Sequence, residues 1–354
     1  SSGMFDIANA DAAVREGKAD LVYMARSWIS NPNYGELVYE GRGEDIVPCV
    51  RCNKCHVPSG REMFRTMCTV NPTLGLEDRL DKMYPREVPS RKVAVVGGGP
   101  AGMEFAKIAA QRGHAVTLYE ATDALGGMVK HADYASFKWP LRRFKDYLIG
   151  QMDTLGVDVR LNTTATKEML LAEGYDMVAV AVGAHPIAPP FPGKDLPNVF
   201  YGMTCYGQQD KLGDTVAVIG GGEIGVETAL WLNELGKRTI VLEMLPELIL
   251  DAPHAHYKNM VHNYWLRQPL FESLTNVRCT AIEPDGVKYI DADGQEKKVF
   301  SDSVLLCAGA ASNTDIAEAL IGAAPQMAFI GDANKFGNVQ KAVREGFAAA
   351  MNIR

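Results

Sequence analysis

The chain has 354 residues, and its 36 Lys and Arg against 43 Asp and Glu give a formal net charge of −7. This acidic balance argues against a nucleic-acid-binding surface and against a polybasic membrane patch. No apolar run approaches the roughly 18–20 residues of a membrane helix, and residues 1–17 lack the apolar core of a signal peptide. At roughly 100–200 residues per domain, the length suggests two or three domains.

The first 48 residues predict one strand between helices. Residues 6–16 indicate a helix, residues 21–25 a buried-type strand ending at Arg26, and residues 35–40 the start of another helix. A single strand of this kind cannot bury both of its faces without a sheet. We therefore expect this segment to be the last β/α unit of a larger domain that contains a sheet.

Four of the seven cysteines fall within twenty residues, spaced Cys49-x2-Cys52-x2-Cys55-x12-Cys68. An odd cysteine count without an export signal argues for a reducing compartment rather than a disulfide framework. Three thiolates in seven residues can hold three corners of a [4Fe–4S] cluster, which the fourth then closes. Tetrahedral zinc is the alternative, although zinc sites usually use two ligand pairs separated by a loop. The other thiols are interpreted as core or surface residues: Cys205, Cys279 and Cys307.

Residues 91–120 predict a strand, a glycine turn, a helix and a second strand. The turn has Gly-x-Gly-x-x-Gly spacing at Gly97, Gly99 and Gly102, and the second strand ends on Glu120. In a dinucleotide-binding domain the first glycine permits a tight turn and the second lets backbone approach a pyrophosphate. The third lets helix and strand pack closely, and the acid binds ribose hydroxyls.

Residues 214–243 repeat this unit 123 residues further along, with the turn at Gly220, Gly222 and Gly225 and the acid at Glu243. This internal duplication predicts two dinucleotide-binding domains of the same build. Glu243 is expected to bind both adenosine ribose hydroxyls and to repel a 2′-phosphate. Because no cation follows it, NADH is favoured over NADPH.

Two further features distinguish the first site. Gly126 and Gly127 form a pair that allows backbone to lie against a second phosphate or a sugar. A short strand near the C-terminus ends in Gly331 and Asp332, before an Ala-rich helix over residues 339–351. This arrangement can aim a carboxylate at a ribityl hydroxyl and helix N–H groups at a phosphate. A plain helix-cap or turn role for Asp332 is the alternative.

The layout resembles the two-dinucleotide-domain flavoproteins of the glutathione- and thioredoxin-reductase class. This resemblance implies an α/β fold with two Rossmann-like domains, the second inserted into the first. It implies a FAD-binding domain over 89–206 and 316–354, an NAD(H)-binding domain over 207–315, and a preceding cluster-binding segment over 49–88.

The resemblance also implies the residues of each site. Those for FAD are Gly97, Gly99, Pro100, Ala101, Gly102, Glu120, Gly126, Gly127, Met128, Gly183, Gly331, Asp332 and Val339. Those for NADH are Gly220, Gly222, Glu223, Ile224, Gly225, Glu243 and Gly309.

A more specific resemblance covers essentially the whole chain. The chain resembles the iron–sulfur NADH:flavin oxidoreductases related to old yellow enzyme. The resemblance rests on the segments 18–32, 45–53 and 68–72 and on the two glycine turns, which follow one another in the order of that family. These include 2-enoate reductase, 2,4-dienoyl-CoA reductase, the bile-acid reductases and trimethylamine dehydrogenase.

These enzymes begin with an FMN-binding TIM barrel, and such a barrel takes about 250 residues. Residues 1–48 are therefore expected to be the C-terminal remnant of that barrel, in a fragment or a gapped sequence. In this family Arg26 matches a residue that helps to bind the FMN phosphate. The catalytic residues stay unknown, because the rest of the barrel is absent.

The family implies an NADH-dependent enzyme of the EC 1.3.1 type. Electrons are expected to pass from NADH through FAD and the [4Fe–4S] cluster to FMN, for reduction of an activated C=C bond in a 2-enoate or enoyl-CoA substrate. One alternative is an amine dehydrogenase of the trimethylamine dehydrogenase type, with ADP at the first site, which the cysteine spacing matches. Two others are a stand-alone electron-transfer module that docks on a separate barrel subunit and a zinc-stabilised flavin reductase.

The expected partner is a small-molecule substrate, an unsaturated carboxylate or thioester, with a homo-oligomer also open. Neither nucleic acid nor membrane is expected as a partner. We predict a cytoplasmic location, in an anaerobic or facultative bacterium.

Overall fold

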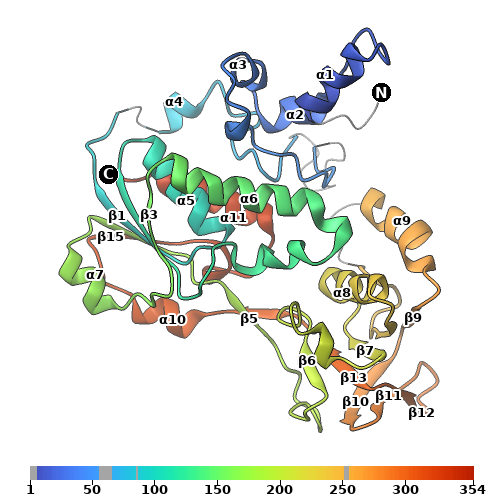
Figure 1. Ribbon diagram of the computed structural model, residues 1–354. Helices are drawn as coiled ribbons and strands as arrows, with labels where there is room; N and C mark the ends of the chain where they lie inside the picture. The colour runs from blue at the N-terminus through green and yellow to red at the C-terminus, as the bar shows by residue number, and fades with distance from the viewer. Residues whose placement is uncertain (1–5, 56–65, 85–86, 251–254) are drawn as a thin grey trace. The chain divides into compact units, whose positions relative to one another are not determined.

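The computed structural model describes residues 6–55, 66–84, 87–250 and 255–354, and Figure 1 traces its elements. The chain divides into two compact units. Unit 1 contains residues 1–130, 139–184 and 312–354, and unit 2 contains residues 131–138 and 185–311. Relative to the expected boundaries, unit 2 thus gains residues 131–138 and 185–206 and loses residues 312–315.

Short helices dominate the first part of unit 1. They are α1 (Ile7–Arg15), α2 (Ala25–Ser30), α3 (Tyr34–Tyr39), the 3₁₀ turn η1 (Gly43–Asp45) and α4 (Leu80–Met83). Asp6 caps α1, because its carboxylate accepts the N–H groups of Ala8 and Asn9 at 2.9 and 3.4 Å.

The helix predicted over residues 6–16 is confirmed, but the strand predicted over residues 21–25 is wrong. Residues 21–24 have no regular structure, and α2 begins at Ala25. A strand needs a hydrogen-bonded neighbour, and no described strand lies beside this segment.

The first sheet is parallel and has the order β15-β4-β1-β2-β3. Its strands are β1 (Lys92–Val96), β2 (Ala115–Tyr119), β3 (Asp158–Arg160), β4 (Met177–Val180) and β15 (Gln326–Phe329). The order reverses direction at β1 and β4, so their carboxyl ends form the crevice in which such sheets bind ligands.

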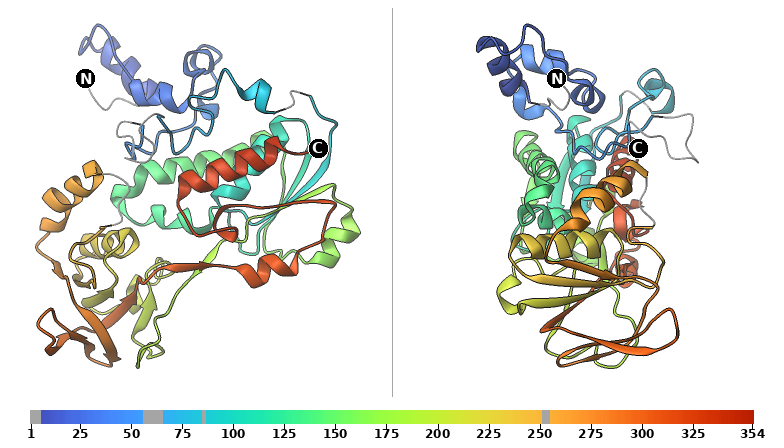
Figure 2. Two further views of the ribbon diagram at one scale, coloured as in Figure 1. Left: turned by 180° about the vertical axis from the view of Figure 1, so that it is seen from behind. Right: turned by 90° about the vertical axis from the view of Figure 1, so that its right-hand side faces the viewer.

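Helices cover both faces of the first sheet, as Figures 1 and 2 show. Val93 and Val95 pack with α5 (Pro100–Gln111), α6 (Trp139–Thr154) and α11 (Val339–Met351). Ala94 and Val96 face the opposite way, toward α7 (Lys167–Glu173) and α10 (Thr314–Ala319). This alternation along a fully buried strand explains why β1 is a continuous apolar run.

The second sheet repeats this topology, in the order β6-β13-β7-β8-β9, and is also parallel. Its strands are β6 (Val199–Tyr201), β7 (Thr215–Ile219), β8 (Arg238–Leu242), β9 (Phe271–Leu274) and β13 (Ser303–Leu306). The helix α8 (Glu223–Glu234) covers one face. The pairing of β6 with β13 explains why residues 185–206 belong to unit 2.

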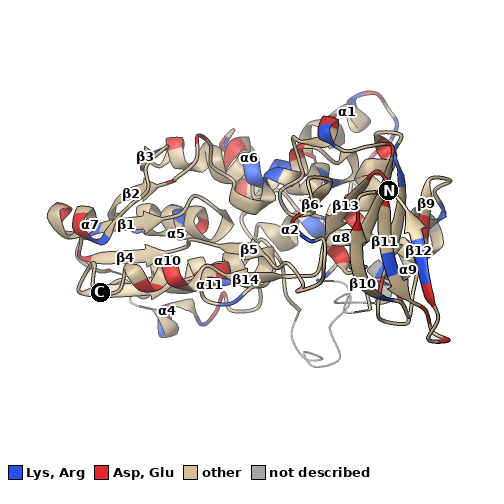
Figure 3. Cartoon of the chain, turned by 90° about the horizontal axis from the view of Figure 1, so that it is seen from below, with Lys and Arg blue, Asp and Glu red and all other residues tan. Residues whose placement is uncertain are grey.

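An antiparallel sheet of β10 (Arg278–Glu283), β11 (Gly286–Ile290) and β12 (Glu296–Phe300) covers the other face. In Figure 3 acidic and basic residues are interspersed along β11 and β12, and Lys298 forms ion pairs with Glu283 and Asp285. The remaining elements are η2 (Gly127–Asp133), η3 (Ser136–Lys138), β5 (Ala184–Pro186), η4 (Gln209–Lys211), α9 (Ala255–Tyr264), η5 (Trp265–Arg267), β14 (Ala310–Ser312) and η6 (Gly331–Ala333).

Residues 131–138 lie between two elements of unit 1 in the sequence but fold with α8 of unit 2. Ala135 is buried in the core of unit 2, and the Tyr134 ring meets Trp231 edge-on at 6.0 Å. The Ser136 N–H donates to Glu234 at 3.0 Å. We call residues 131–138 the α8 clasp.

Candidate functional site

The turn between β1 and α5 requires glycine at its first and third positions. Gly97 has φ +110°, and a Cβ there would lie 2.3 Å from the Ala181 carbonyl oxygen. A Cβ on Gly102 would lie 2.0 Å from the Gly97 carbonyl oxygen. At Gly99, by contrast, a Cβ would make only an ordinary van der Waals contact, 3.9 Å from Gly127 Cα, so the surrounding residues do not require glycine there.

The turn between β7 and α8 has the same geometry. A Cβ on Gly220 would lie 2.4 Å from the Cys307 carbonyl oxygen, and one on Gly225 would lie 1.9 Å from the Gly220 carbonyl oxygen. A Cβ on Gly222 would meet nothing within 4 Å. In both units, therefore, two glycines serve packing and the middle one leaves room for a ligand.

The helices that follow these turns begin without side-chain caps. Gly99 and Gly222 are the N-cap residues of α5 and α8, and neither end has a side-chain hydrogen bond to its first N–H groups. Free N–H groups and the positive end of the helix dipole suit a pyrophosphate. Pro100 begins α5 and Glu223 begins α8, so the sequence-predicted residues occupy the first turn of each helix.

The two acids tie their strands to the turns. Glu120 accepts the N–H groups of Gly98 and Thr122, each at 2.8 Å. Glu243 accepts the N–H of Gly221 at 2.5 Å and that of Leu245 at 2.8 Å. Glu120 Oε1 also accepts from the Thr122 hydroxyl at 2.8 Å. Because each carboxylate oxygen offers two lone pairs, both acids still keep acceptor capacity for a ribose hydroxyl.

The loops that follow the two acids make equivalent backbone hydrogen bonds, but they differ in residue type at the same position. The Gly126 N–H donates to the Gly98 carbonyl at 2.9 Å, and the Ile249 N–H donates to the Gly221 carbonyl at 2.8 Å. Gly126 has φ +121° and Ile249 has φ +47°. A left-handed conformation is a rare, strained state for a β-branched residue. Gly127 then packs on the first turn, where its Cβ would lie 2.9 Å from Gly99 Cα.

The C-terminal turn of unit 1 is built on α11. The Asp332 carboxylate accepts the Gly337 N–H at 2.9 Å, and burial raises its pKa above the ordinary aspartate value. The Gly331 N–H donates to Glu345 at 2.7 Å, and the Gly331 carbonyl accepts from Lys341 at 2.8 Å. Sequence reasoning missed Lys341 and Glu345, whose i,i+4 spacing on a helix was the available signal.

The remaining predicted residues lie at the ends of strands or helices. Gly183 follows β4 with φ +74°, and Gly309 follows β13 with φ +109°. Val339 is the first residue of α11. Arg26 donates to the Asn53 side chain at 2.9 Å, which joins α2 to the cysteine segment.

The four clustered thiols influence one another. Burial raises the pKa of Cys68 to about 11, and negative charge on Cys52 and Cys49 adds to the rise. Burial and the same two neighbours also raise the pKa of Cys55. Mutual repulsion of this kind is what a bound cation relieves, because metal-coordinating thiols are deprotonated. The donor set therefore fits an iron–sulfur cluster or zinc.

Backbone and hydroxyl groups also surround the thiols. The Arg51 N–H donates to Cys49 Sγ at 3.5 Å, and Cys52 Sγ lies 3.0 Å from Thr69 Oγ1. Hydrogen bonds to sulfur are one means by which proteins tune such clusters. Within the described residues, no three His, Cys, Asp or Glu side chains are arranged as ligands of one metal ion.

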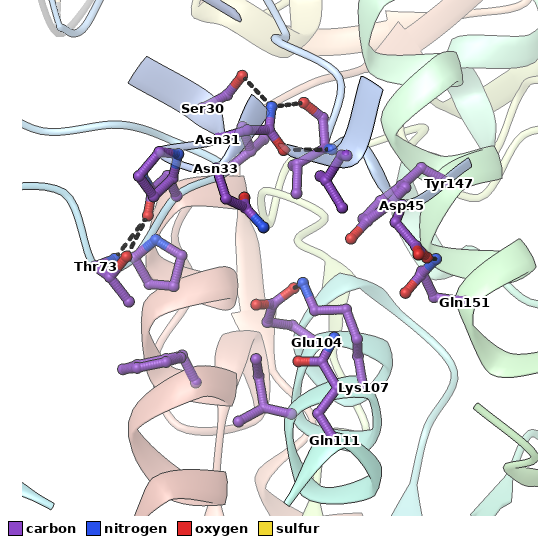
Figure 4. Close-up of a pocket in the computed structure, with 18 of the residues that line it drawn as sticks. Ser30, Asn31, Asn33, Asp45, Thr73, Glu104, Lys107, Gln111, Tyr147 and Gln151 are labelled. Atoms are coloured by element: carbon purple, nitrogen blue, oxygen red, sulfur yellow. Dashed lines mark hydrogen bonds and ion pairs between the residues drawn. The ribbon is translucent and has the colours of Figure 1, made fainter. Parts of the chain in front are cut away.

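A separate cavity of about 440 Å³ lies within unit 1 and contains none of the predicted site residues (Figure 4). In Figure 4 the side chains of Asn33 and Glu104 point toward it. Lys107 Nζ lies 2.7 Å from Glu104 Oε2, although neither Glu104 oxygen has an aligned hydrogen-bond donor among the described residues. Burial lowers the pKa of Lys107, but the Glu104 carboxylate and the Tyr147 hydroxyl together outweigh it, so the net shift is upward.

Two parallel sheets, each with a glycine turn at a helix N-terminus and an acid at the end of the next strand, define a protein with two dinucleotide-binding domains. The chain belongs to the family described as pyridine nucleotide-disulphide oxidoreductase, whose model matches residues 64–170 and 91–326. Thioredoxin reductase from T. acidophilum shares this fold, with a TM-score of 0.57 at 19% identity over 75% of this chain and 97% of that chain.

The more specific resemblance is also confirmed. Bilirubin reductase from Mediterraneibacter gnavus is 35% identical over 97% of this chain and 53% of its own length. Cinnamate reductase from Clostridium sporogenes is 29% identical over 96% of this chain and 51% of its own. A structure of 2-naphthoyl-CoA reductase with 2-naphthoyl-CoA has a TM-score of 0.91 at 34% identity, over 98% of this chain and 52% of that chain.

The chain thus spans about half the length of the relatives that it matches. It corresponds to the FAD/NAD(P)-binding half of the flavin and iron–sulfur reductases related to old yellow enzyme. Among the described helices, none combines the length and the apolar character of a membrane-spanning segment.

Proposed function

We propose that the chain is the electron-input half of an NADH-dependent reductase of activated C=C bonds. It takes electrons from NADH at the second turn, passes them through FAD at the first turn and a [4Fe–4S] cluster at the four cysteines, and delivers them to FMN. The observation that carries this proposal is the pair of open middle glycines, Gly99 and Gly222, each at an uncapped helix N-terminus.

When bound, the flavin supplies the conversion between a two-electron hydride donor and one-electron carriers. The chain's own residues bind and orient. The first turns of α5 and α8 hold pyrophosphates, and Glu120 and Glu243 accept ribose hydroxyls. Glu243 also disfavours the 2′-phosphate of NADPH. Asp332 accepts a ribityl hydroxyl, and the four cysteines hold the cluster.

The substrate class follows from the relatives' names. Cinnamate is a 2-enoate, and 2-naphthoyl-CoA is an unsaturated thioester. A C=C bond conjugated to a carboxylate or thioester is therefore the expected acceptor. We place the substrate pocket and FMN in a barrel of the kind that the family resemblance implies.

Large apolar side chains are exposed in the N-terminal segment: Leu21 is 89%, Tyr23 77% and Tyr39 95% exposed. Exposed apolar surface of this kind marks an interaction site. We propose that this segment packs against the rest of the FMN-binding barrel, and that Arg26 then contributes to the FMN phosphate site.

The test is an anaerobic titration of the chain, reconstituted with FAD, iron and sulfide. NADH should bleach the flavin absorbance and produce the EPR signal of a reduced cluster, and NADPH should do so more weakly. Chain that is loaded with flavin and cluster yet is not bleached by NADH contradicts the proposal. Extraction of ADP instead of FAD from the natural protein favours the amine dehydrogenase alternative, and zinc without iron favours the zinc-stabilised flavin reductase.

A further inference from the structure

Gln340, in the first turn of α11, contacts two separate residues of the cluster-binding segment over 49–88. Its side-chain oxygen accepts from Lys54 Nζ at 2.5 Å. Its side-chain N–H donates to the Cys68 carbonyl at 3.4 Å. Gln340 is only 7% exposed; its contact with Cys68 is buried, and its contact with Lys54 is half-buried. One amide therefore holds the residue next to Cys55 and the backbone of Cys68 itself.

The same helical turn also holds the C-terminal flavin turn. Lys341, the next residue, donates to the carbonyls of Gly331 and Lys335 at 2.8 and 2.6 Å. Asn338 caps the helix by accepting the Lys341 N–H at 3.1 Å. Gln340 and Lys341 thus attach one rigid helix end to the cysteine segment on one side and to the Gly331–Asp332 turn on the other.

We propose that Gln340 is a positioning residue for electron transfer between FAD and the cluster. This inference rests on the proposed function. The step that it serves is a one-electron oxidation of reduced FAD coupled to a one-electron reduction of the cluster. It occurs twice per NADH, with release of the flavin proton to solvent and delivery of both electrons to FMN or an added acceptor.

Glutamine suits this role because its amide presents an acceptor and a donor at once without a net charge. Glutamate at the same position keeps the acceptor for Lys54 but loses the donor to Cys68, and it adds a negative charge beside the thiolates. Methionine has a similar length and keeps neither hydrogen bond. Gln295 lies on the exposed β11–β12 turn and offers a matched control for the same chemical change.

The kinetic experiment uses the full chain, reconstituted with FAD, iron and sulfide, in anaerobic stopped flow with NADH. In Gln340→Met the rate of flavin bleaching should stay near that of the unmodified chain, while cluster reduction slows by about tenfold, because small misplacements cost rate steeply. Gln295→Glu should change neither rate. Unchanged cluster reduction in both Gln340→Met and Gln340→Glu overturns the proposal.

Two readouts separate this inference from a merely structural role and from the proposed function. In an EPR-monitored redox titration with dithionite, Gln340→Glu should shift the cluster midpoint to a lower potential, because the added charge disfavours the extra electron. In the chain without cofactors, Gln340→Met should speed amide hydrogen exchange around Lys54 and Thr69. If NADH fails to bleach even the unmodified chain, the proposed function fails, whereas an unshifted midpoint and unchanged exchange overturn the role of Gln340.

Discussion

Gly222 and Gly225, in the turn between β7 and α8, have different surroundings. Substitution of one should therefore affect NADH binding, and substitution of the other should affect stability. Gly225→Ala forces a Cβ to 1.9 Å from a backbone oxygen and should destabilise the chain by about 1–3 kcal/mol. Gly222→Ala places its Cβ more than 4 Å from every atom of the described residues other than its chain neighbours and should change stability by less than about 0.5 kcal/mol. It should nevertheless weaken NADH binding by about tenfold or more, because the new methyl group occupies the approach of the pyrophosphate.

Urea denaturation and NADH titration of the two variants check this prediction. The paired substitutions Gly99→Ala and Gly102→Ala should show the same contrast for FAD. Equal loss of stability in Gly222→Ala and Gly225→Ala contradicts the assignment of open space to the middle glycine.

Substitution of Asp332 should raise the stability of the flavin-free chain and lower its affinity for FAD. Because burial raises its pKa in the folded chain, its ionised form costs stability above that folded pKa, and the cost disappears as pH falls through it. Without flavin, Asp332→Asn should therefore be more stable than the unmodified chain at pH 7. Its FAD affinity should fall by about tenfold, because an acceptor for a hydroxyl loses its charge.

Thermal denaturation without FAD and fluorescence titration with FAD measure the two effects. Asp293→Asn, on the exposed β11–β12 turn, is the control for loss of one negative charge. If Asp332 is only a turn residue, flavin affinity stays unchanged.

At this scale the glycines and acids could be predicted because their roles are local. Gly102 and Glu120 contact residues that the strand–turn–helix pattern itself supplies, whereas Gly97 also faces the Ala181 carbonyl from the segment after β4. Gln340 was missed because its partners are set by tertiary packing. Lys341 and Glu345 pair locally at i,i+4 spacing, but that spacing does not predict their contacts with Gly331. No local pattern places residue 340 beside residues 54 and 68.

At the scale of elements, α5 carries a buried ion pair. The Glu104 and Lys107 side chains are 1% and 6% exposed. Glu104→Gln should destabilise the chain by about 3–5 kcal/mol, because it leaves an ammonium buried without a countercharge. The double variant Glu104→Met with Lys107→Met should cost clearly less, because it removes both charges.

Urea denaturation at pH 7 compares these variants. The raised pKa of Lys107 means that the pair's contribution is complete below about pH 10.5 and is lost as pH rises through the folded pKa. A Glu104→Gln variant as stable as the unmodified chain excludes a structural role for the pair.

The strands and helices of the two dinucleotide units were predictable because each apolar run is bounded by glycine turns and repeats 123 residues later. The strand, helix and second strand predicted within residues 91–120 match β1, α5 and β2. The strand expected over residues 21–25 failed for a physical reason. Its apolar pattern fits a sheet, but the neighbouring strands that satisfy a sheet's backbone groups are not among the described strands.

At the scale of the whole molecule, the chain passes between the two units at four places. Two of these crossings flank the α8 clasp, which the sequence did not predict because its contacts lie about 70 to 100 residues away. Tyr134→Ala should destabilise unit 2 by about 1 kcal/mol, through lost ring contacts with Tyr206 and Trp231.

Hydrogen exchange measures this effect locally. Amides of α8 should exchange faster in Tyr134→Ala, whereas those of α7 should not change. Tyr39→Ala, which removes a ring that is 95% exposed, is the control and should leave α8 unchanged. Unaltered α8 exchange in Tyr134→Ala indicates that the clasp is not a part of unit 2 in solution.

Gly126 and Ile249 occupy equivalent positions in the two dinucleotide-binding units but are different residue types. Its counterpart Gly126 holds its turn without a side chain, whereas Ile249 fills its turn and adopts a backbone conformation that costs about 1–3 kcal/mol. Such a cost persists only where the surroundings enforce it. The side chains of Lys130 and Lys145 crowd the space beside Gly126, where a Cβ would lie 3.0 and 3.1 Å from them, whereas the Ile249 side chain is itself buried in the core of unit 2. The two units therefore share the glycine signature but differ in the residue that closes the loop after each acid.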